Sequence, residues 1–470
     1  MERHAPEIIF KNCDSSAARR VALIDVPKEN WGARPAMVLD IVDRVMYQSL
    51  VDRLSVGLIG DMSPSVFGWR LPPKAPKAGM YSHNDLQWDS YRTHLGELAG
   101  EYGVALRSDL VSFFASIPLE GVKGGVEDRS PKNAVSKRLF SFLDGVDRVP
   151  ERSGLPQRST ASAVLANMLL QPIDDVLDHY ASSGARTFPS GAQRRSFARW
   201  MDDVWLFLTD ASTARRAQVD LQNAAQAIGL YLNSAKTDVL EGDDVAEQAL
   251  EIEHSAVDSA LDVDDTEPLE ELIERVLSNP EKSNRTTIKF MSKRMRDNNV
   301  QHRHHDLVST APRMPHGADA LALLFKQFFT TGSLQDWLLY YAESDWAAFE
   351  WSTAQYLRMF PSARKPKAAT VAFAAEALSN VDTSLPLLAV AAQRMSAWDP
   401  PEARAIARDV MRRTSNPHAR RVIALAAMNA GEGRTSVRRW LDSEPENAVT
   451  LAMLEKHGFG GLKVVVDYAD

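Results

Sequence analysis

The sequence is poor in cysteine and in long apolar runs. Cys13 is its single cysteine, which excludes a disulfide framework and leaves almost no basis for a cysteine-ligated zinc site. No stretch reaches the roughly 20 apolar residues of a membrane span, and no apolar leader follows the charged residues 1–4. We therefore expect a cytoplasmic protein with no membrane partner. The 44% hydrophobic and 25% charged residues exclude a long disordered chain.

The sequence also lacks the positive charge expected of a nucleic-acid-binding protein. Its formal net charge is −8 over 470 residues, a length that predicts more than one domain. The acidity is concentrated, because residues 241–270 hold twelve Asp or Glu and no Lys or Arg. The rest of the chain carries a formal charge of +4. We interpret the acidic segment as a solvated linker, with contact to a basic partner surface as the alternative. The net charge therefore does not exclude a nucleic-acid enzyme.

Apolar periodicity predicts a mixed first half of the chain. Residues 1–35 show little pattern and are expected to be mostly irregular. Helices are predicted at 37–54 and 88–102, and a short strand at 104–106. Apolar residues at i, i+3, i+4, i+7 and i+8 predict a helix over 161–169, and a further amphipathic helix covers 217–228. Residues 197–208 are expected to form a hairpin that turns at two adjacent acids.

The second half is predicted to be helical. A basic helix at 285–296 is followed, from about residue 311, by Ala- and Leu-rich sequence. Paired helices are expected at 367–378 with 385–396, 401–413 with 418–430, and 434–441 with 448–457. Their spacing favours an α-solenoid of the HEAT or TPR type. The alternative is an irregular helical bundle.

Two adjacent carboxylates, Asp202 and Asp203, interrupt the apolar hairpin. Burial of an unpaired carboxylate costs several kcal/mol, which a bound divalent metal would offset, whereas a solvent-exposed polar turn would need no metal. Asp109 stands just after the predicted strand at 104–106 and adds a third acid. Two further segments complete the set: 154–157 (GLPQ) lies between Asp109 and the hairpin, and 229–237 (GLYLNSAKT) follows the hairpin.

These four segments, in this order, resemble the palm motifs of reverse transcriptases. The resemblance covers about residues 37–240, and residues 40–52 are similar to the N-terminal motif of bacterial abortive-infection and defence-associated members, several of which carry a helical repeat domain. It implies an α+β fold in which right-hand polymerase fingers and palm (1–240) precede an acidic linker and helical thumb (241–310). An α-helical, HEAT-like repeat domain (311–470) would follow.

The resemblance also implies roles for individual residues. Asp109, Asp202 and Asp203 would be catalytic and would hold two Mg²⁺ ions, with Mn²⁺ as an alternative. Lys236 matches a candidate general acid, and its alternative is a solvated lysine. Phe114 matches the gate that selects dNTPs, and its alternative is a core phenylalanine. The remaining predicted dNTP-binding residues are Gln157, Arg158 and Arg70.

Two positions depart from the family pattern. Arg158 stands where the family usually has glycine, and Trp200 replaces the usual Tyr or Phe before the acids. Glycine would allow a close approach of backbone to nucleotide, which an arginine crowds. Both departures put ordinary templated copying in doubt without changing the carboxylates.

A basic stripe on the predicted helix 285–296 suggests a thumb that contacts nucleic acid. Its members are Arg285, Lys289, Lys293 and Arg296. The alternative is a solvated helix face. Three nearby histidines, at 302, 304 and 305, are read as part of a polar loop rather than as metal ligands.

The sequence thus predicts a DNA polymerase of reverse-transcriptase type that serves antiphage defence. Some members of the defence-associated group make DNA without a template, and some start from a protein hydroxyl, so both features are possible implications of the resemblance. One alternative is templated copying of a bound RNA. The other is an inactive palm that serves as a binding scaffold. The implied partners are dNTPs, single-stranded DNA product and RNA, with self-association through the helical repeats.

Overall fold

The computed structural model describes residues 17, 19–72, 76–130, 132–181, 186–187, 193–250 and 252–459. These residues form two compact units. The sheet unit contains Asp43–Ser255, and the helical unit contains Arg20–Val42 with the described chain from Ala256 onward. No helix within these ranges is both long enough and apolar enough to cross a membrane.

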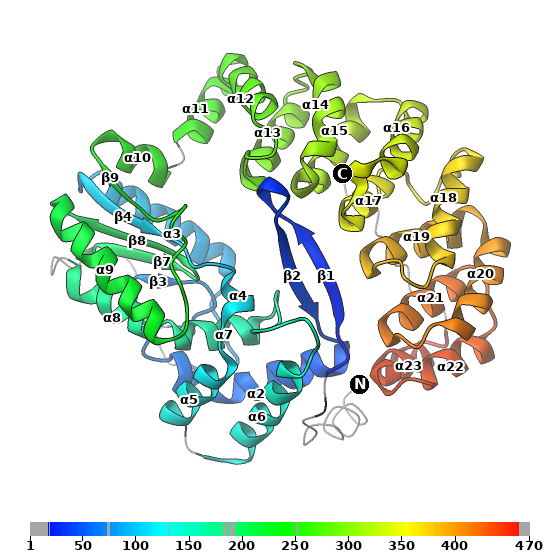
Figure 1. The fold of residues 1–470 in the computed structure, drawn as a ribbon, viewed down its shortest axis with the longest axis horizontal. Coiled ribbons are helices and arrows are strands. Elements are labelled where there is room, and N and C mark those ends of the chain that lie inside the picture. The colour runs from blue at the N-terminus through cyan, green and yellow to red at the C-terminus, as the bar shows by residue number, and fades with distance from the viewer. Residues whose placement is uncertain are drawn as a thin grey trace. The chain divides into compact units, whose positions relative to one another are not determined.

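The sheet unit is built on five strands in the order β3, β7, β8, β4, β9 (Figure 1). Their bounds are Val66–Phe67 for β3, Phe197–Trp200 for β7, Asp203–Leu208 for β8, Val104–Ser108 for β4 and Asp238–Glu241 for β9. β7 and β8 form an antiparallel hairpin, and β4 runs antiparallel to both β8 and β9. The end of β4 therefore lies beside the β7–β8 turn. A separate two-stranded pair joins β5 (Arg186–Thr187) to β6 (Gln193–Arg194).

Helices cover both faces of the five-stranded sheet. Alternate strand residues such as Trp205 and Phe207 form one buried cluster with Tyr91 of α3 (Asn84–Ala99) and Val245 of α10 (Asp243–Leu250). Helices α8 (Gln171–Tyr180) and α9 (Ala211–Ala227) pack against β8 and β4 from the other side, in front of the sheet in Figure 1. The remaining helices of the unit are α2 (Ile41–Ile59), α4 (Phe113–Ser116), α5 (Leu119–Arg129), α6 (Ala134–Asp147) and α7 (Thr160–Leu169).

The helical unit begins with an antiparallel hairpin. β1 (Ala22–Pro27) and β2 (Ala33–Val38) are joined by the 3₁₀ turn η1 (Glu29–Trp31). β1 packs against α17 (Glu350–Leu357) and α19 (Leu385–Trp398). The helices of this unit are α11 (Ile252–Leu261), α12 (Glu267–Ser278), α13 (Arg285–Asp297), α14 (His304–Thr310), α15 (Ala318–Phe328), α16 (Thr331–Glu343), α17 (Glu350–Leu357), α18 (Ala368–Ser379), α19 (Leu385–Trp398), α20 (Pro400–Arg413), α21 (Pro417–Asn429), α22 (Arg434–Asp442) and α23 (Ala448–Lys456). Four further 3₁₀ turns are η2 (Ala311–Arg313), η3 (Pro315–Gly317), η4 (Asp345–Ala347) and η5 (Pro445–Asn447).

Most elements with a strong periodic signal are confirmed. Strand β4, the β7–β8 hairpin, and helices α3, α7, α9 and α13 lie where the sequence predicts them, to within a few residues. The expected C-terminal helix pairs correspond to α18 with α19, α20 with α21, and α22 with α23. The α+β class with a small sheet is thereby confirmed, while the HEAT-like character stays a prediction.

Two expectations are wrong. Residues 22–27 and 33–38 are strands rather than irregular chain, because each supplies hydrogen-bonding partners to the other, so the following helix α2 begins at Ile41. The acidic segment is largely helical rather than a linker: it contains α10, α11 and the start of α12. Asp243 and Glu267 lie in first turns of these helices, where the helix dipole favours negative charge. The compact units divide near Val42 and Ser255. The expected limits of the polymerase, thumb and repeat domains, at 240 and 310, stay predictions.

Candidate active site

Three carboxylates gather at one end of the sheet. Asp109 follows β4 directly, Asp202 lies in the β7–β8 turn, and Asp203 begins β8. The register pairs Ser108 with Val204 and Trp200 with Asp203, so the end of β4 adjoins the turn. The sheet topology thus brings together acids that are more than ninety residues apart in the sequence.

Burial and neighbouring charges raise the pKa values of two of these carboxylates, Asp202 and Asp203. Burial, followed by the negative charge of Asp109, raises the pKa of Asp202 to about 7. Burial also raises the pKa of Asp203, against the opposing charge of Arg107. The Tyr91 hydroxyl of α3 donates a hydrogen bond to Asp203 Oδ2 at 3.0 Å. Asp109 and Asp202 therefore repel each other, while Asp203 is held by a hydroxyl.

The donor chemistry of this cluster fits a hard divalent cation. Among the described residues, no group of three or more His, Cys, Asp or Glu side chains is already arranged to hold a metal ion. Asp109 and Asp202 nevertheless supply the carboxylate oxygens that Mg²⁺ prefers. A bound cation would also remove the like-charge repulsion that raises the pKa of Asp202. Tyr91 occupies Oδ2 of Asp203, so Oδ1 of Asp203 would be the oxygen left for a metal.

Lys236 reaches the same cluster from the segment that follows α9. Its Nζ lies 3.2 Å from Asp109 Oδ2, although more than half of the side chain is exposed. The segment is fixed by its backbone, since Asn233 N–H donates to the Asp109 carbonyl at 2.7 Å and Leu232 bridges to Leu110. The structure thus places the sequence-predicted Lys236 in contact with Asp109.

The predicted gate and nucleotide loop lie side by side. Phe113 is buried, as expected for a core residue, whereas its neighbour Phe114 is only half-buried. Leu155 N–H donates to the Phe114 carbonyl at 2.8 Å. A Cβ at Gly154 would lie 2.1 Å from that carbonyl oxygen, so only glycine permits this approach. Further along the loop, Gln157 is half-buried and Arg158 is exposed, with a left-handed φ of 55° that normally favours glycine.

Arg70 serves the fold in a way the sequence did not suggest. Its guanidinium donates to the backbone carbonyls of Met62, Ser63, Pro64 and Val66 at 2.7–3.3 Å. Burial, with the nearby charge of Arg194, lowers the pKa of Arg70 to about 10. These contacts close the loop before β3, and binding of triphosphate by Arg70 stays a prediction.

The basic stripe on α13 belongs to the helical unit. Ile288, Met291 and Met295 are buried, which confirms the predicted apolar face. Lys289 and Lys293 are exposed, but Arg285 forms an ion pair with Asp319 at 2.6 Å, and Arg296 is half-buried. The two lysines therefore remain the better candidates for contact with nucleic acid.

The three nearby histidines contact an acid or an aromatic ring. His302 Nε2 lies 3.0 Å from Glu274 Oε1. His304 and His305 belong to α14, not to a loop, and their rings pack against Phe329.

Sequence reasoning missed the buried arginine that holds the acidic turn. Arg199 of β7 has no exposed surface, and its guanidinium makes a two-point ion pair with Asp174 of α8 at 2.6 and 2.8 Å. It also donates to Asn167 Oδ1 of α7 at 3.0 Å and to the Met201 carbonyl at 2.9 Å. Met201 has a left-handed φ of 57°. The detectable signal was a charged residue inside a strand of apolar side chains.

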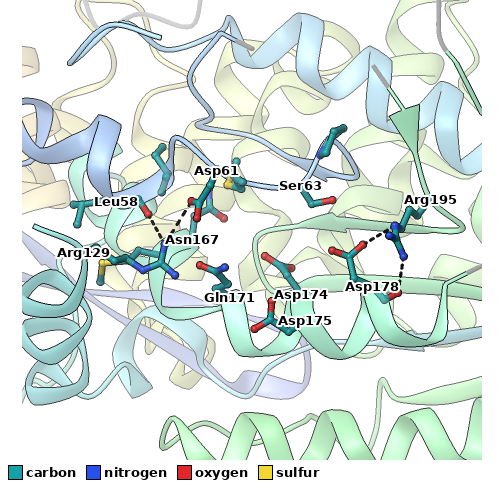
Figure 2. Close-up of a pocket in the computed structure, with 14 residues that line it drawn as sticks. Leu58, Asp61, Ser63, Arg129, Asn167, Gln171, Asp174, Asp175, Asp178 and Arg195 are labelled. Atoms are coloured by element: carbon teal, nitrogen blue, oxygen red, sulfur yellow. Dashed lines mark hydrogen bonds and ion pairs between the residues drawn. The ribbon is translucent and has the colours of Figure 1, made fainter. Parts of the chain in front are cut away.

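A pocket of about 210 Å³ opens next to this network. Figure 2 shows Asn167, Gln171 and Asp174 along its wall, with Arg129 paired to Asp61 at one end and Arg195 paired to Asp178 at the other. Asn167 and Asp174, which line one wall of the pocket, also accept hydrogen bonds from Arg199. The same two residues therefore line the pocket and hold the arginine that supports the acidic turn.

Comparison with known families places this geometry in context. The family model described as reverse transcriptase (RNA-dependent DNA polymerase) matches residues 26–307, more than half of the chain. The match includes the three carboxylates, Lys236, the Phe114 and Gly154 loops and helix α13. A search of curated proteins found no match.

Proposed function

The chain belongs to the reverse transcriptase (RNA-dependent DNA polymerase) family, and from this premise we propose that it is a DNA polymerase that adds dNTPs by two-metal catalysis. The observation that carries the proposal is the meeting of Asp109 and Asp202 at the end of β4, close enough for the charge of one to raise the pKa of the other. A scaffold without chemistry would have no need to bear that repulsion.

The residues then take the following roles. Asp109, Asp202 and Asp203 would hold two Mg²⁺ ions, for which Mn²⁺ is an alternative. When bound, the ions lower the pKa of the attacking hydroxyl and stabilise the pyrophosphate leaving group. Lys236, at 3.2 Å from Asp109, gives a proton to the leaving group. Phe114 presents its half-buried ring to the sugar and selects dNTPs, while Gln157 and Arg158 line the nucleotide.

We expect stabilisation of the protein by Mg²⁺ to grow between about pH 6 and about pH 8. Burial and the charge of Asp109 raise the pKa of Asp202 from its usual 3.8 to about 7, so the metal-free fold loses stability as the pH rises from about 4 to about 7. Mg²⁺ binds the ionised carboxylate, so its gain in thermal midpoint should be larger on the alkaline side. Thermal unfolding with and without Mg²⁺ at both pH values measures this. Asp202→Asn should flatten the dependence, and an equal Mg²⁺ effect at both pH values in the unsubstituted protein would contradict it.

We further propose that synthesis needs no added template and serves antiphage defence. Support comes from the resemblance of residues 40–52 to defence-associated members, from the helical C-terminal region, and from the exposed Arg158 in place of glycine. The side chain of Arg158 would crowd the loop where a template base approaches its nucleotide. Self-association through the helical unit is part of the same proposal.

We propose that a tyrosine hydroxyl of the protein accepts the first nucleotide. Burial of the side chain decides which tyrosines are suitable for this role. Tyr47 is fully buried, its hydroxyl lies 3.2 Å from Ser162 Oγ, and burial raises its pKa well above the usual value. Tyr47 is therefore a poor nucleophile as it stands. Tyr231 and Tyr340 are among the exposed tyrosines of the described chain.

One assay separates the candidate functions. Purified protein with Mg²⁺ and labelled dNTPs, but no nucleic acid, is expected to yield product that stays with the protein on a denaturing gel and is released by protease. Product that forms only with added RNA template and primer would favour the alternative of templated copying. No product under either condition would leave the binding-scaffold alternative.

A further inference from the structure

Three tryptophans from separate segments meet beside the acidic turn. Trp200 ends β7, Trp88 lies in α3, and Trp69 follows β3. The rings of Trp88 and Trp200 meet edge to face with centroids 4.9 Å apart, and Trp69 lies 5.9 Å from Trp200. Tyr91, at 5.7 Å from Trp200, forms the floor of the cluster. We call Trp69, Trp88 and Trp200 the tryptophan cluster.

The tryptophan cluster is partly exposed to solvent, whereas the Tyr91 ring beneath it is buried. Tyr91 is 2% exposed, whereas Trp88 is 45% exposed and both Trp69 and Trp200 are half-buried. Near Trp88 in the sequence, Leu86 and Met80 are also exposed. One exposed and two half-buried indole rings lie side by side, and such an apolar patch in contact with solvent indicates a binding surface.

The backbone around Trp69 is fixed in an unusual conformation. Trp69 has a left-handed φ of 49° and follows Gly68, whose φ is 78°. Asn84 Oδ1 of α3 accepts from Trp69 N–H at 2.9 Å, and Asn167 Nδ2 of α7 donates to the Gly68 carbonyl at 3.1 Å. A non-glycine residue is strained at such φ values, and the two asparagines hold it there. The position of the indole is thus determined by two helices.

The cluster is joined directly to the catalytic carboxylates. Trp200 is paired across the hairpin with Asp203, so their side chains lie on the same face of the sheet. Tyr91 contacts Trp200 with its ring and donates its hydroxyl to Asp203. An indole ring, the Tyr91 ring and a carboxylate of the acidic turn therefore share one face of the sheet.

We propose that the tryptophan cluster is a stacking site for unpaired bases of single-stranded DNA next to the point of nucleotide addition. The proposal rests on the proposed function, which supplies a DNA strand at Asp202 and Asp203. Every base has an aromatic face, so indole rings bind single strands with little sequence preference. Bases of a duplex already stack on each other and cannot use the rings.

The test measures binding without catalysis. Full-length protein is titrated into a fluorescently labelled oligo-dT of about 20 nucleotides, with a metal chelator and no dNTPs. Loss of one stacked base costs roughly 1–3 kcal/mol, so Trp88→Ala should weaken binding by about tenfold or more. Trp88→Phe keeps a ring and should remain within about threefold of the unsubstituted protein. The matched control is Trp346→Ala, which removes another half-exposed indole, at 43% exposure, from η4 of the helical unit.

Each outcome decides the proposal. Tenfold weaker oligo-dT binding by Trp88→Ala, with duplex DNA binding unchanged, supports it. Equal affinity of Trp88→Ala and unsubstituted protein for oligo-dT overturns it, as does an equal loss for single-stranded and duplex DNA. A selective loss for an RNA oligonucleotide assigns the site to RNA and also overturns it. Asp202→Asn is expected to bind oligo-dT with normal affinity but to add no nucleotides. Binding and nucleotide addition are measured in separate assays, so failure of the polymerase proposal can be told apart from failure of the stacking site.

Discussion

Asp202→Asn should abolish nucleotide addition while leaving the fold intact. The asparagine keeps the shape but lacks the charge that holds a divalent ion next to Asp109. Loss of about 4 kcal/mol of charge stabilisation in the transition state corresponds to a rate about a thousandfold lower. Because burial and Asp109 raise the pKa of Asp202 to about 7, its negative charge is unfavourable to the metal-free fold. The substitution should therefore preserve or raise the thermal midpoint at neutral pH.

Comparison with a second variant isolates this effect. Asp128→Asn removes a carboxylate of the same sheet unit from the exposed surface of α5, and it should retain full incorporation of dNTPs. Normal activity of Asp202→Asn would show that the chemistry lies elsewhere. In cells challenged with phage, protection by the unsubstituted protein but not by Asp202→Asn would support the defence role. Equal protection by both would leave that role unrelated to polymerisation.

Arg199→Met should produce the largest loss of stability. The substitution removes one partner of a buried ion pair and leaves the carboxylate of Asp174 without its counter-charge. Breaking such a pair typically costs about 3–5 kcal/mol, which for a unit of this size corresponds to a fall of roughly 10 °C in the thermal midpoint. The Met201 carbonyl also loses its donor, so the turn that carries Asp202 is no longer fixed. Differential scanning fluorimetry and dNTP incorporation measure the two effects.

The charge origin of that loss can be checked in two ways. Burial already raises the pKa of Asp174, and removal of Arg199 should raise it further, so the deficit of Arg199→Met should shrink as the pH falls and the carboxyl is protonated. The double variant Arg199→Met with Asp174→Leu removes both charges and should recover much of the stability, but not the activity. A deficit that is independent of pH and unrelieved in the double variant would indicate lost packing instead.

Site residues that lie in a short sequence motif could be predicted, and those brought together only by the fold could not. Asp109, Asp202 and Lys236 each sit in a short segment with its own pattern of strand, turn or helix, and the structure brings all three together. Arg70 carried no such pattern, because its task is to bind carbonyls of its own loop. Trp200 could be noted in the sequence, but its contacts with Tyr91, Trp88 and Trp69 could not, since these residues lie on three segments that only the folded sheet unit brings together.

By itself, the sequence determined the elements whose apolar period matches a helix or strand, and the order of the chemical segments along the chain. Period and turn chemistry are properties of a few neighbouring residues, so they can be read without a fold. Only the tertiary structure decided that β1 and β2 pair with each other and pack in the helical unit, that the acidic segment is helical, and that Arg199 is buried between α7, α8 and the acidic turn. Each of these depends on partners distant in sequence, whose burial and charge compensation override the local composition.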